Sequence, residues 1–464
     1  MHNETLYHTF LELLKDQFTP EDEKNIIALV QKHHAADLAP VLDQLEMQQA
    51  ARVLKYMEMP FQAEVFGYLE PSTQSNLVDE LGVAHITRLI DVMDADDRVD
   101  FYNNLDEEHQ QAILPGLAQA EREDIRKLSS YGEGTVGAIM TSDYAALAQN
   151  LRAGEALERL RQEAPDKETI YNAYVVDEHR QLMGVVSLKD LILAQPGTLV
   201  TDLMNSDVVS INAAEHQSEA ARKIAKYDLL ALPVINGNDK LAGIVTHDDA
   251  MDVAEAEATE DIHRMGGVSP SAPGLGSVNM LEASTWMMVQ KRLPWLLVLV
   301  FMNIFSGAGI AHFEDTIEAV VALVFFLPLL IDSGGNAGSQ SATLMIRALA
   351  TGRAHLRDWF TLLSKEIGVA ILLGVGMALA VSLIGVFRAG PEVAVVVAMT
   401  MVCTVLFGSL VGTALPFVLS RLKLDPATAS APLVTSIADI GGVLIYFSIA
   451  TWVLRDIIAA AGAA

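Results

Sequence analysis

Apolar residues in the first 130 positions recur at intervals of three and four, with little alternation of β-branched residues. This spacing places them on one face of a helix. The pattern also repeats every 24 residues, in the apolar pairs Val41-Leu42, Val65-Phe66, Leu89-Ile90 and Ile113-Leu114. Three positions after each pair stands another apolar residue. A repeat this short predicts stacked helix pairs, so we expect an all-α helical-repeat N domain over residues 1–130.

The pattern changes at about residue 131, where short β-type runs alternate with helices. We expect strands at 170–176, 183–187, 208–211, 231–235 and 241–246. This block is an internal duplication, because Leu182–Asp190 matches Leu241–Asp249. Similar openers, Ile139–Thr141 and Leu203–Asn205, stand ahead of the two copies. We therefore expect an α+β unit built from two copies over residues 131–264.

Residues 265–292 begin with a hinge rich in glycine and proline and end with an amphipathic segment, 278–292, that we expect to be a connecting (plug) helix. Residues 293–464 are far more apolar. They contain runs long enough to cross a bilayer, at about 293–311, 317–346, 366–387, 393–420 and 430–454. The prediction is a multidomain membrane protein that ends in a five-helix transmembrane domain.

Basic residues decide the orientation of these spans. They gather on one side, at Lys291, Arg292, Arg347, Arg353, Arg357, Lys365, Arg421 and Lys423. Since cytosolic loops carry the excess of Lys and Arg, we expect a cytosolic N-terminus and a C-terminus outside. The first residues lack the basic-then-apolar pattern of a signal peptide, which agrees with a multi-pass protein of the cytoplasmic (inner) membrane.

Charge divides the chain in the same place as hydropathy. The whole chain is 51% hydrophobic, with a mean hydropathy of +0.30. Residues 1–277 hold 21 basic and 48 acidic side chains, whereas residues 278–464 hold 10 and 11. The acidity belongs to the front part, where it calls for cations as counterions. An acidic surface of this kind argues against nucleic acid as a partner.

Two spans contain polar groups that do not suit lipid. Asp439 lies about 15 Å along the fifth span, near the middle of the membrane. There a charge costs from about 3 to more than 10 kcal/mol, which makes it a candidate functional site. The second span carries the glycine-rich stretch Asp332–Ser341. The structural alternatives are a protonated Asp439 inside the bundle and a tight packing surface at the glycines.

We interpret the two polar stretches as an ion pathway. Its candidate ligands are Asp439, Thr435 and Ser436 in the fifth span and Asp332 and Asn336 in the second. One carboxylate per chain makes a weak divalent site. A two-fold dimer would bring two copies of Asp439 to one axis, where they could hold a hydrated Mg²⁺ ion.

A second acidic concentration spans residues 248–261, where carboxylates recur three and four positions apart. On one helix face such charges repel each other unless a cation neutralises them. Oxygen ligands without Cys or His favour Mg²⁺ or Ca²⁺ over zinc. The alternative is an exposed helix in a polar linker.

The duplicated block resembles paired CBS domains, since strand, glycine turn, strand, Ser/Thr and Asp-led helix occur twice in tandem. The resemblance implies a compact pair that often self-associates. It also implies an adenine nucleotide such as ATP as a ligand, with Thr246 and Asp249 at positions that often contact ribose.

Nearly the whole chain resembles the MgtE family of magnesium transporters. The specific matches are the stretches 330–350, 255–263 and 432–439, together with Asp425-Pro-Ala. The resemblance implies a homodimeric Mg²⁺ channel whose pore helices carry Asp439. It departs at Ala431 and Ser339, where relatives often have an amide or another polar residue, which leaves selectivity among Mg²⁺, Mn²⁺, Co²⁺ and Ca²⁺ open.

The same resemblance implies that Mg²⁺ closes the pore by bridging acidic faces of the cytosolic domains. The candidate regulatory ligands are Asp249, Asp252, Glu255, Glu257, Glu260 and Asp228, with Asp91, Asp94 and Asp97 in the N domain. The rival functions are a proton- or sodium-coupled divalent-metal transporter or exporter and a CBS-regulated sensor without conduction. An enzyme is not expected, because the chain has no His-Glu-x-x-His and no phosphate-binding glycine loop.

Overall fold

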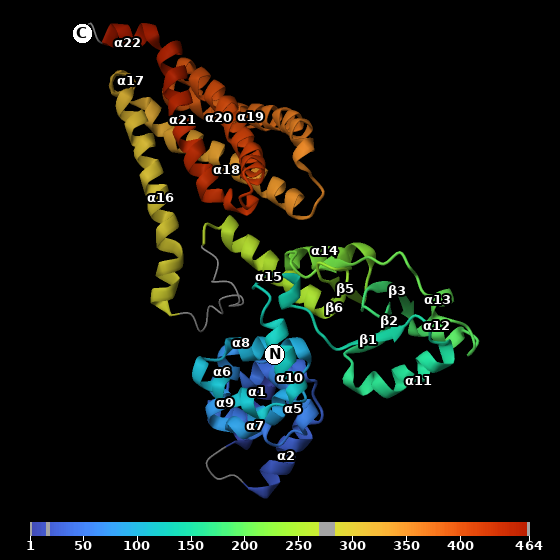
Figure 1. Ribbon diagram of the computed structural model, residues 1–464. Helices are drawn as coiled ribbons and strands as arrows, with labels where there is room; N and C mark the ends of the chain where they lie inside the picture. The colour runs from blue at the N-terminus through green and yellow to red at the C-terminus, as the bar shows by residue number, and fades with distance from the viewer. Residues whose placement is uncertain (1, 15–18, 269–283, 462–464) are drawn as a thin grey trace. The chain divides into compact units, whose positions relative to one another are not determined.

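The chain divides between residues 254 and 255 into two units, which are described one at a time below, in the computed structural model drawn in Figure 1. The structure describes residues 2–14, 19–268 and 284–461. Most of the predicted hinge, and the first residues of the predicted connecting helix, lie outside these ranges.

The first part of unit 1 is helical throughout its described residues, as the spacing of apolar positions predicts. Its elements are α1 (His2–Leu13), α2 (Pro20–Val30), α3 (Ala35–Leu42), α4 (Met47–Leu54), α5 (Met59–Gly67), α6 (Pro71–Leu81), α7 (Val83–Ile90), α8 (Ala95–Asn104), α9 (Glu107–Ile113), η1 (Leu114–Gly116) and α10 (Gln119–Leu128). Odd-numbered helices from α3 to α9 pack in succession, and so do the even-numbered helices from α4 to α10.

The 24-residue repeat is confirmed as a repeat of helix pairs. The apolar pairs of the sequence fall at the C-terminal ends of α3, α5, α7 and α9, and the apolar residue after each pair is buried. A polar contact repeats with the same period. Gln74 Nε2 donates to the carbonyl of Phe66 (2.7 Å) and, 24 residues later, Arg98 Nε donates to that of Ile90 (3.1 Å). Each side chain adds a second donor to a helix-end carbonyl that already accepts a backbone amide, from Leu69 and Met93 respectively.

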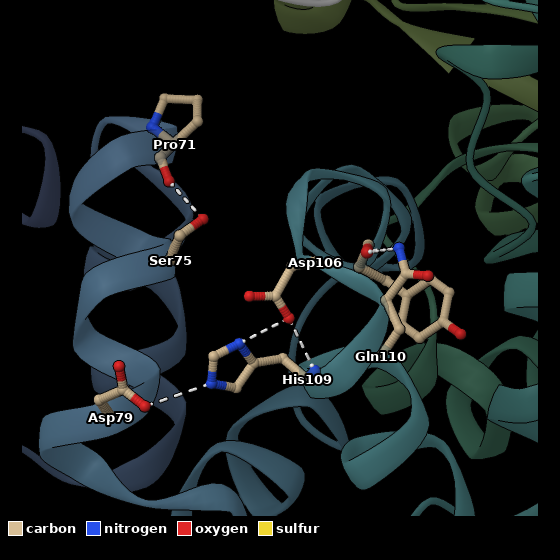
Figure 2. A network of polar contacts seen from close by, with 7 residues as sticks. Pro71, Ser75, Asp79, Asp106, His109 and Gln110 are labelled. Carbon is tan, nitrogen blue, oxygen red and sulfur yellow. Dashed lines mark hydrogen bonds and ion pairs between the residues drawn. The ribbon is translucent and has the colours of Figure 1, made fainter.

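A histidine braces two of these helices from the side. Figure 2 shows His109 of α9 between Asp106, at the start of its own helix, and Asp79 of α6. Its Nδ1 lies 2.9 Å from Oδ1 of Asp106, and its Nε2 lies 3.2 Å from Oδ1 of Asp79. Burial alone lowers the pKa of His109, but the two carboxylates outweigh burial, so the net shift of this pKa is upward.

The second part of unit 1 holds two three-stranded sheets of identical topology. The first consists of β1 (Tyr144–Ala148), β2 (Thr169–Val176) and β3 (Leu182–Ser187), and the second of β4 (Ile211–Asn212), β5 (Ala231–Ile235) and β6 (Leu241–Thr246). In each sheet the first two strands are parallel and the last two antiparallel. The remaining elements of this region are η2 (Val136–Ala138), α11 (Ala153–Glu163), η3 (Ala164–Asp166), α12 (Leu188–Leu193), α13 (Val200–Leu203), α14 (Gln217–Tyr227) and α15 (His247–Met265), whose residues from Glu255 onward belong to unit 2.

The sequence prediction of these strands needs two corrections. The predicted strand at 208–211 is only Ile211–Asn212, because these two residues alone pair with β5. The strand β1 was not predicted. Three of its five residues are alanine, which favours helices, and pairing with β2 overrides that preference.

The short segment ahead of each copy pairs with the sheet of the other copy. Thr141, ahead of the first copy, bridges to Ile244 in β6, whereas Asn205, ahead of the second, bridges to Val185 in β3. A Cβ at Gly243 would lie 2.6 Å from the carbonyl oxygen of Thr141. This close approach requires glycine in the strand, so the glycine that each copy carries lies inside β3 or β6 and not in the turn that the sequence predicted.

Unit 2 contains the predicted spans. Five helices are long and apolar enough to cross a membrane within the described residues: α16 (Thr285–His312), α18 (Ala322–Ala350), α19 (Trp359–Ala389) with its preceding turn η4 (Leu356–Asp358), α20 (Pro391–Arg421) and α21 (Ala431–Val453). Shorter elements are α17 (Glu314–Ala319), η5 (Pro426–Thr428) and α22 (Arg455–Ala461). Where it is described, the predicted connecting helix is not separate from the first span, because nothing between residues 285 and 293 ends α16.

Glycines set the distance between α18 and α20. A Cβ at Gly408 would lie 2.0 Å from the carbonyl oxygen of Gly334, and one at Gly412 would lie 2.0 Å from that of Gly338. The two backbones are therefore in direct contact, as in the small-residue packing of membrane helices. The tight packing surface considered for the glycines of the polar stretch is therefore present at Gly334 and Gly338.

Replacing Gly408 with Ala should destabilise this helix pair by about 3 kcal/mol, because the added methyl group has no space and the neighbouring atom is backbone. The thermal stability of the purified protein in detergent measures this effect. Gly376→Ala in α19 is the matched control, since a Cβ there meets nothing within 4 Å. Equal melting temperatures for the two variants would contradict the close packing.

Candidate functional site

Unit 1 contains a cluster of carboxylates, which we call the acidic cluster. It consists of Asp94, Asp96, Asp97 and Asp100 at the start of α8, Glu168 just before β2, and Asp248 and Asp249 at the start of α15. Oxygen atoms of Glu168, Asp248 and Asp249 all lie within 4.8 Å of one another. Asp96 and Asp249 lie close enough for their charges to interact. Residues from the helical repeat and from both copies of the duplicated block thus meet in one place.

Burial and mutual repulsion raise the pKa values of several carboxyl groups in this cluster. Burial raises the pKa of Asp97 to about 7, and the charges of Asp94 and Asp100 add to the shift. Burial raises the pKa of Glu168 to about 8, although a hydrogen bond from Thr141 lowers it in part. With these pKa values, both groups are partly protonated near neutral pH.

Some oxygens of the acidic cluster lack a partner. Asp96 Oδ1 and Glu168 Oε2 are buried and accept no hydrogen bond in the part of the chain that the structure describes. A buried carboxylate oxygen without a partner is costly, and a cation with oxygen ligands would satisfy it. With carboxylates and no Cys or His in this donor set, the site fits a hard ion such as Mg²⁺.

The predicted regulatory residues separate into two groups. Asp94, Asp97 and Asp249 belong to the acidic cluster. The remaining predicted residues lie elsewhere. Asp91 lies near Glu121 and Arg98, and Asp228 is an exposed helix end in the left-handed conformation. The others follow along α15, at Asp252, Glu255, Glu257 and Glu260.

Four members of the acidic cluster were missed by sequence reasoning. Asp96 and Asp100 had a usable signal, since Asp100 follows Asp96 by four residues and Asp97 by three, spacings that make helix residues neighbours. Asp248 precedes Asp249 in an acidic run. Glu168 had no such signal in the sequence. It lies just before β2, and only the fold brings it to the start of α15.

The predicted nucleotide residues have a local structural role. Thr246 Oγ1 donates to Asp249 Oδ2 at the start of α15. In the first copy, Ser187 Oγ donates to Asp190 Oδ2 (2.6 Å) and accepts from the Asp190 amide (3.0 Å). The repeated Ser/Thr-x-x-Asp pattern is therefore a helix cap, in which side chain and backbone satisfy each other.

A second candidate site lies between α18 and α21 of unit 2. Asp332, Asn336 and Ser339 share one face of α18, since they are four and three residues apart. Asn336 Nδ2 donates to Asp332 Oδ2 (3.0 Å). The Ser339 hydroxyl lies 3.2 Å from that of Thr435 on α21. One turn further along α21 stands Asp439, close enough to Asp332 for their charges to interact.

We call these residues the polar line. It runs along the two spans, with Ser339 of α18 beside Thr435 of α21 and Asp332 of α18 near Asp439 of α21. Ser436 does not belong to it, because it lies about 100° round the helix from Thr435 and is buried. Gly335 of α18 leaves room for Thr435, whose methyl carbon would lie 2.9 Å from an added Cβ.

The polar line is open on one side. Asp332 and Asn336 are exposed and Asp439 is half-buried. Among the residues that the structure describes, neither Asp332 nor Asp439 forms an ion pair. Lipid cannot satisfy these groups, so the open side must face water, an ion or a second protein surface.

Family models match four ranges of the chain. A model described as "Divalent cation transporter" matches residues 327–449, one for the MgtE intracellular N domain matches 33–134, and the CBS domain model matches 136–197 and 200–256. The polar line lies within the first match. The acidic cluster has members in the N-domain match and in both CBS matches.

Individual relatives agree with these family models. The magnesium transporter MgtE of Thermus thermophilus is 44% identical over 338 residues, which cover 72% of this chain and 74% of that protein. The magnesium transporter MgtE of Bacillus subtilis is 34% identical and covers 81% and 82%. The crystal structure of the soluble part of a magnesium transporter covers 55% of this chain and 99% of that one, with 31% identity and a TM-score of 0.50.

Proposed function

Because the chain belongs to the MgtE family of magnesium transporters, we propose that it is a homodimeric Mg²⁺ channel of the cytoplasmic membrane that Mg²⁺ itself closes. The observation that carries the proposal is the polar line, a set of oxygen-bearing side chains inside helices that are otherwise mostly apolar. The N-terminal unit is cytosolic in this proposal, and the C-terminus lies outside.

The polar line suits a hydrated Mg²⁺ ion. Mg²⁺ gives up its water reluctantly, so proteins usually hold it by one or two carboxylates with several waters retained. Asp332 and Asp439 supply the charge, while Asn336, Ser339 and Thr435 supply neutral oxygens that can bind the retained waters. Carboxylates spaced along the path attract a divalent ion without dehydrating it fully, which permits it to leave again.

A dimer follows from the open side of the polar line. A second copy related by a two-fold axis would place another Asp439 and Asp332 opposite the first and enclose the pathway in protein. Unit 1 offers a further apolar surface for self-association, since Ile192 and Leu193 of α12 are 62% and 73% exposed.

Gating depends on the acidic cluster. At low Mg²⁺ the carboxylates of α8 and α15 repel each other, which favours their separation. Mg²⁺ bound between them replaces repulsion by attraction and stabilises the associated state. Closure by Mg²⁺ requires only that the ion bind the associated, closed state more tightly than the open one.

This proposal predicts an inverse dependence of stability on pH. The folded-state pKa of Asp97, about 7, is above its unfolded value of 3.8, so unit 1 binds extra protons on folding and loses stability as pH rises through about 7. Without Mg²⁺, hydrogen exchange in α8 and at the start of α15 should therefore quicken between pH 6 and 8.5, after correction for intrinsic exchange. Millimolar Mg²⁺ should cancel the effect, and exchange that slows with rising pH would contradict it.

Growth of a bacterial strain that lacks magnesium uptake tests the function itself. The chain should restore growth at low external Mg²⁺, and a variant without the described spans should not. If the chain instead lowers the Mg²⁺ content of the cells, it is an exporter. If it changes neither growth nor Mg²⁺ content, a sensor without conduction is the better account.

A further inference from the structure

The last turn of α15 is joined to the turn before α21 by a single arginine. Arg264 Nη1 donates to Asp425 Oδ2, and Nη2 of the same guanidinium donates to Glu260 Oε1. All three residues belong to unit 2. Asp425 in turn caps η5, since its Oδ1 accepts from the Ala427 amide (2.8 Å). The guanidinium thus connects α15 to the short turn that leads directly into α21.

Apolar packing supports the same junction. Met265, the final residue of α15, packs against a small cluster that includes Ala427, Ala429 and Val434. Val434 is the residue before Thr435 in the polar line. The end of α15 therefore rests on the first turn of the helix that carries Asp439.

Arg264 supplies the positive charge that two carboxylates would otherwise need from solution. The side chains of Arg264 and Asp425 are 29% and 31% exposed, so water screens the pair only in part. Arg264 Nε is buried without an acceptor in the described part of the chain, which shows that both outer nitrogens, rather than Nε, make the connection. Glu260, expected above to bind a regulatory metal ion, is engaged by this arginine.

We propose that Arg264 is an ionic latch that fastens α15 to the turn preceding α21 and thereby favours the closed state. The latch rests on the proposed function, because α15 also carries the acidic cluster at its other end. Arg264 is a positioning residue for gating and does not contact the conducted ion. Metal binding at the start of α15 and the latch at its end would then hold the same helix from both sides.

Loss of the latch should shift the balance between open and closed states about fivefold toward open, the lower end of typical coupling between sites. The Mg²⁺ concentration that halves the flux should rise by a similar factor in Arg264→Gln. In Arg264→Lys this concentration should lie between the values for the unmodified chain and Arg264→Gln. Lysine retains the charge but cannot donate to both carboxylates in a fixed fork. Arg357→Gln, at an 81% exposed arginine paired with its neighbour Asp358, is the matched control.

Exchanging the charges of Arg264 and Asp425 distinguishes the loss of a specific ion pair from general damage to the fold. Arg264→Glu alone should open the junction further, because it would place a third carboxylate beside Glu260 and Asp425. Adding Asp425→Arg should restore closure, since the new arginine would face Glu260 and the new glutamate together. Glu260 remains unchanged in both variants.

The test uses full-length protein in liposomes, with Mg²⁺ flux and hydrogen exchange of peptides 255–268 and 425–434 measured on the same samples. We expect faster exchange in both peptides for Arg264→Gln, and recovery in the exchanged pair. Flux and exchange in Arg264→Gln equal to those of the unmodified chain would overturn the latch. If the unmodified chain shows no closure by Mg²⁺, the proposed function fails, whereas the exchange measurement still decides whether Arg264 fastens α15.

Discussion

Replacing Asp439 with Asn is expected to lower Mg²⁺ flux through the reconstituted protein by at least about 100-fold. The substitution keeps the size of the side chain and its ability to form hydrogen bonds, but removes the charge at the deepest point of the polar line. In a dimer it removes two charges at once. A divalent ion crossing the membrane then has neutral ligands where it most needs a negative partner. A magnesium-sensitive dye inside the liposomes measures the flux.

Asp332→Asn should have a smaller effect in the same assay, because Asp439 remains and Asn336 keeps a hydrogen-bond partner. Asp456→Asn serves as the control, since this carboxylate is 95% exposed in α22, beyond the end of the fifth span. Undiminished flux in Asp439→Asn, with a dimer of normal size, would refute the ion pathway.

Neutralising Asp97, Asp249 and Glu168 together, each as its amide, should leave the channel conducting at Mg²⁺ concentrations that close the unmodified chain. The three residues come from α8, α15 and the segment before β2, so the substitutions remove ligands from every side of the acidic cluster. They remove the repulsion as well, but amide contacts hold two faces together less strongly than a bridging divalent ion does. We expect the concentration for half-closure to rise at least about tenfold, in line with the loss of differential binding.

The comparison variant changes Glu178 and Asp207 to their amides, two exposed carboxylates of the same unit outside the acidic cluster. It should close like the unmodified chain. Closure of the triple variant at an unchanged Mg²⁺ concentration would mean that the sensor lies elsewhere, and the residues along α15 from Asp252 to Glu260 would be the next to test.

Periodicity predicted the helices and spans well because the apolar residues of a long helix mark the face that it buries. The 24-residue repeat gave the stacking of α3 to α9 for the same reason. The strand β1 and the pairing of each opener with the other copy escaped prediction, since both are fixed by partners far away in the chain. Thr141 pairs with Ile244 across about a hundred residues, and no local pattern records that contact.

The two candidate sites differ in how far sequence could locate them. Asp332, Asn336, Thr435 and Asp439 stand out because polar residues are rare inside apolar spans, and the structure brings them into one line. Ser436 shares the sequence signal but faces a different side of the helix. In unit 1 the large number of acidic residues prevented the sequence from identifying the site. Carboxylates are so common there that only the fold distinguishes Glu168 from its many acidic neighbours.

The most direct measurement of the central claim is Mg²⁺ flux through the purified protein in liposomes, with the Mg²⁺ concentration on the side of the N-terminal unit varied. The account predicts rapid flux down the Mg²⁺ gradient when that concentration is low, and a steep fall as it rises. Flux that requires a proton or sodium gradient, or that never exceeds that of protein-free liposomes, would contradict a Mg²⁺-gated Mg²⁺ channel.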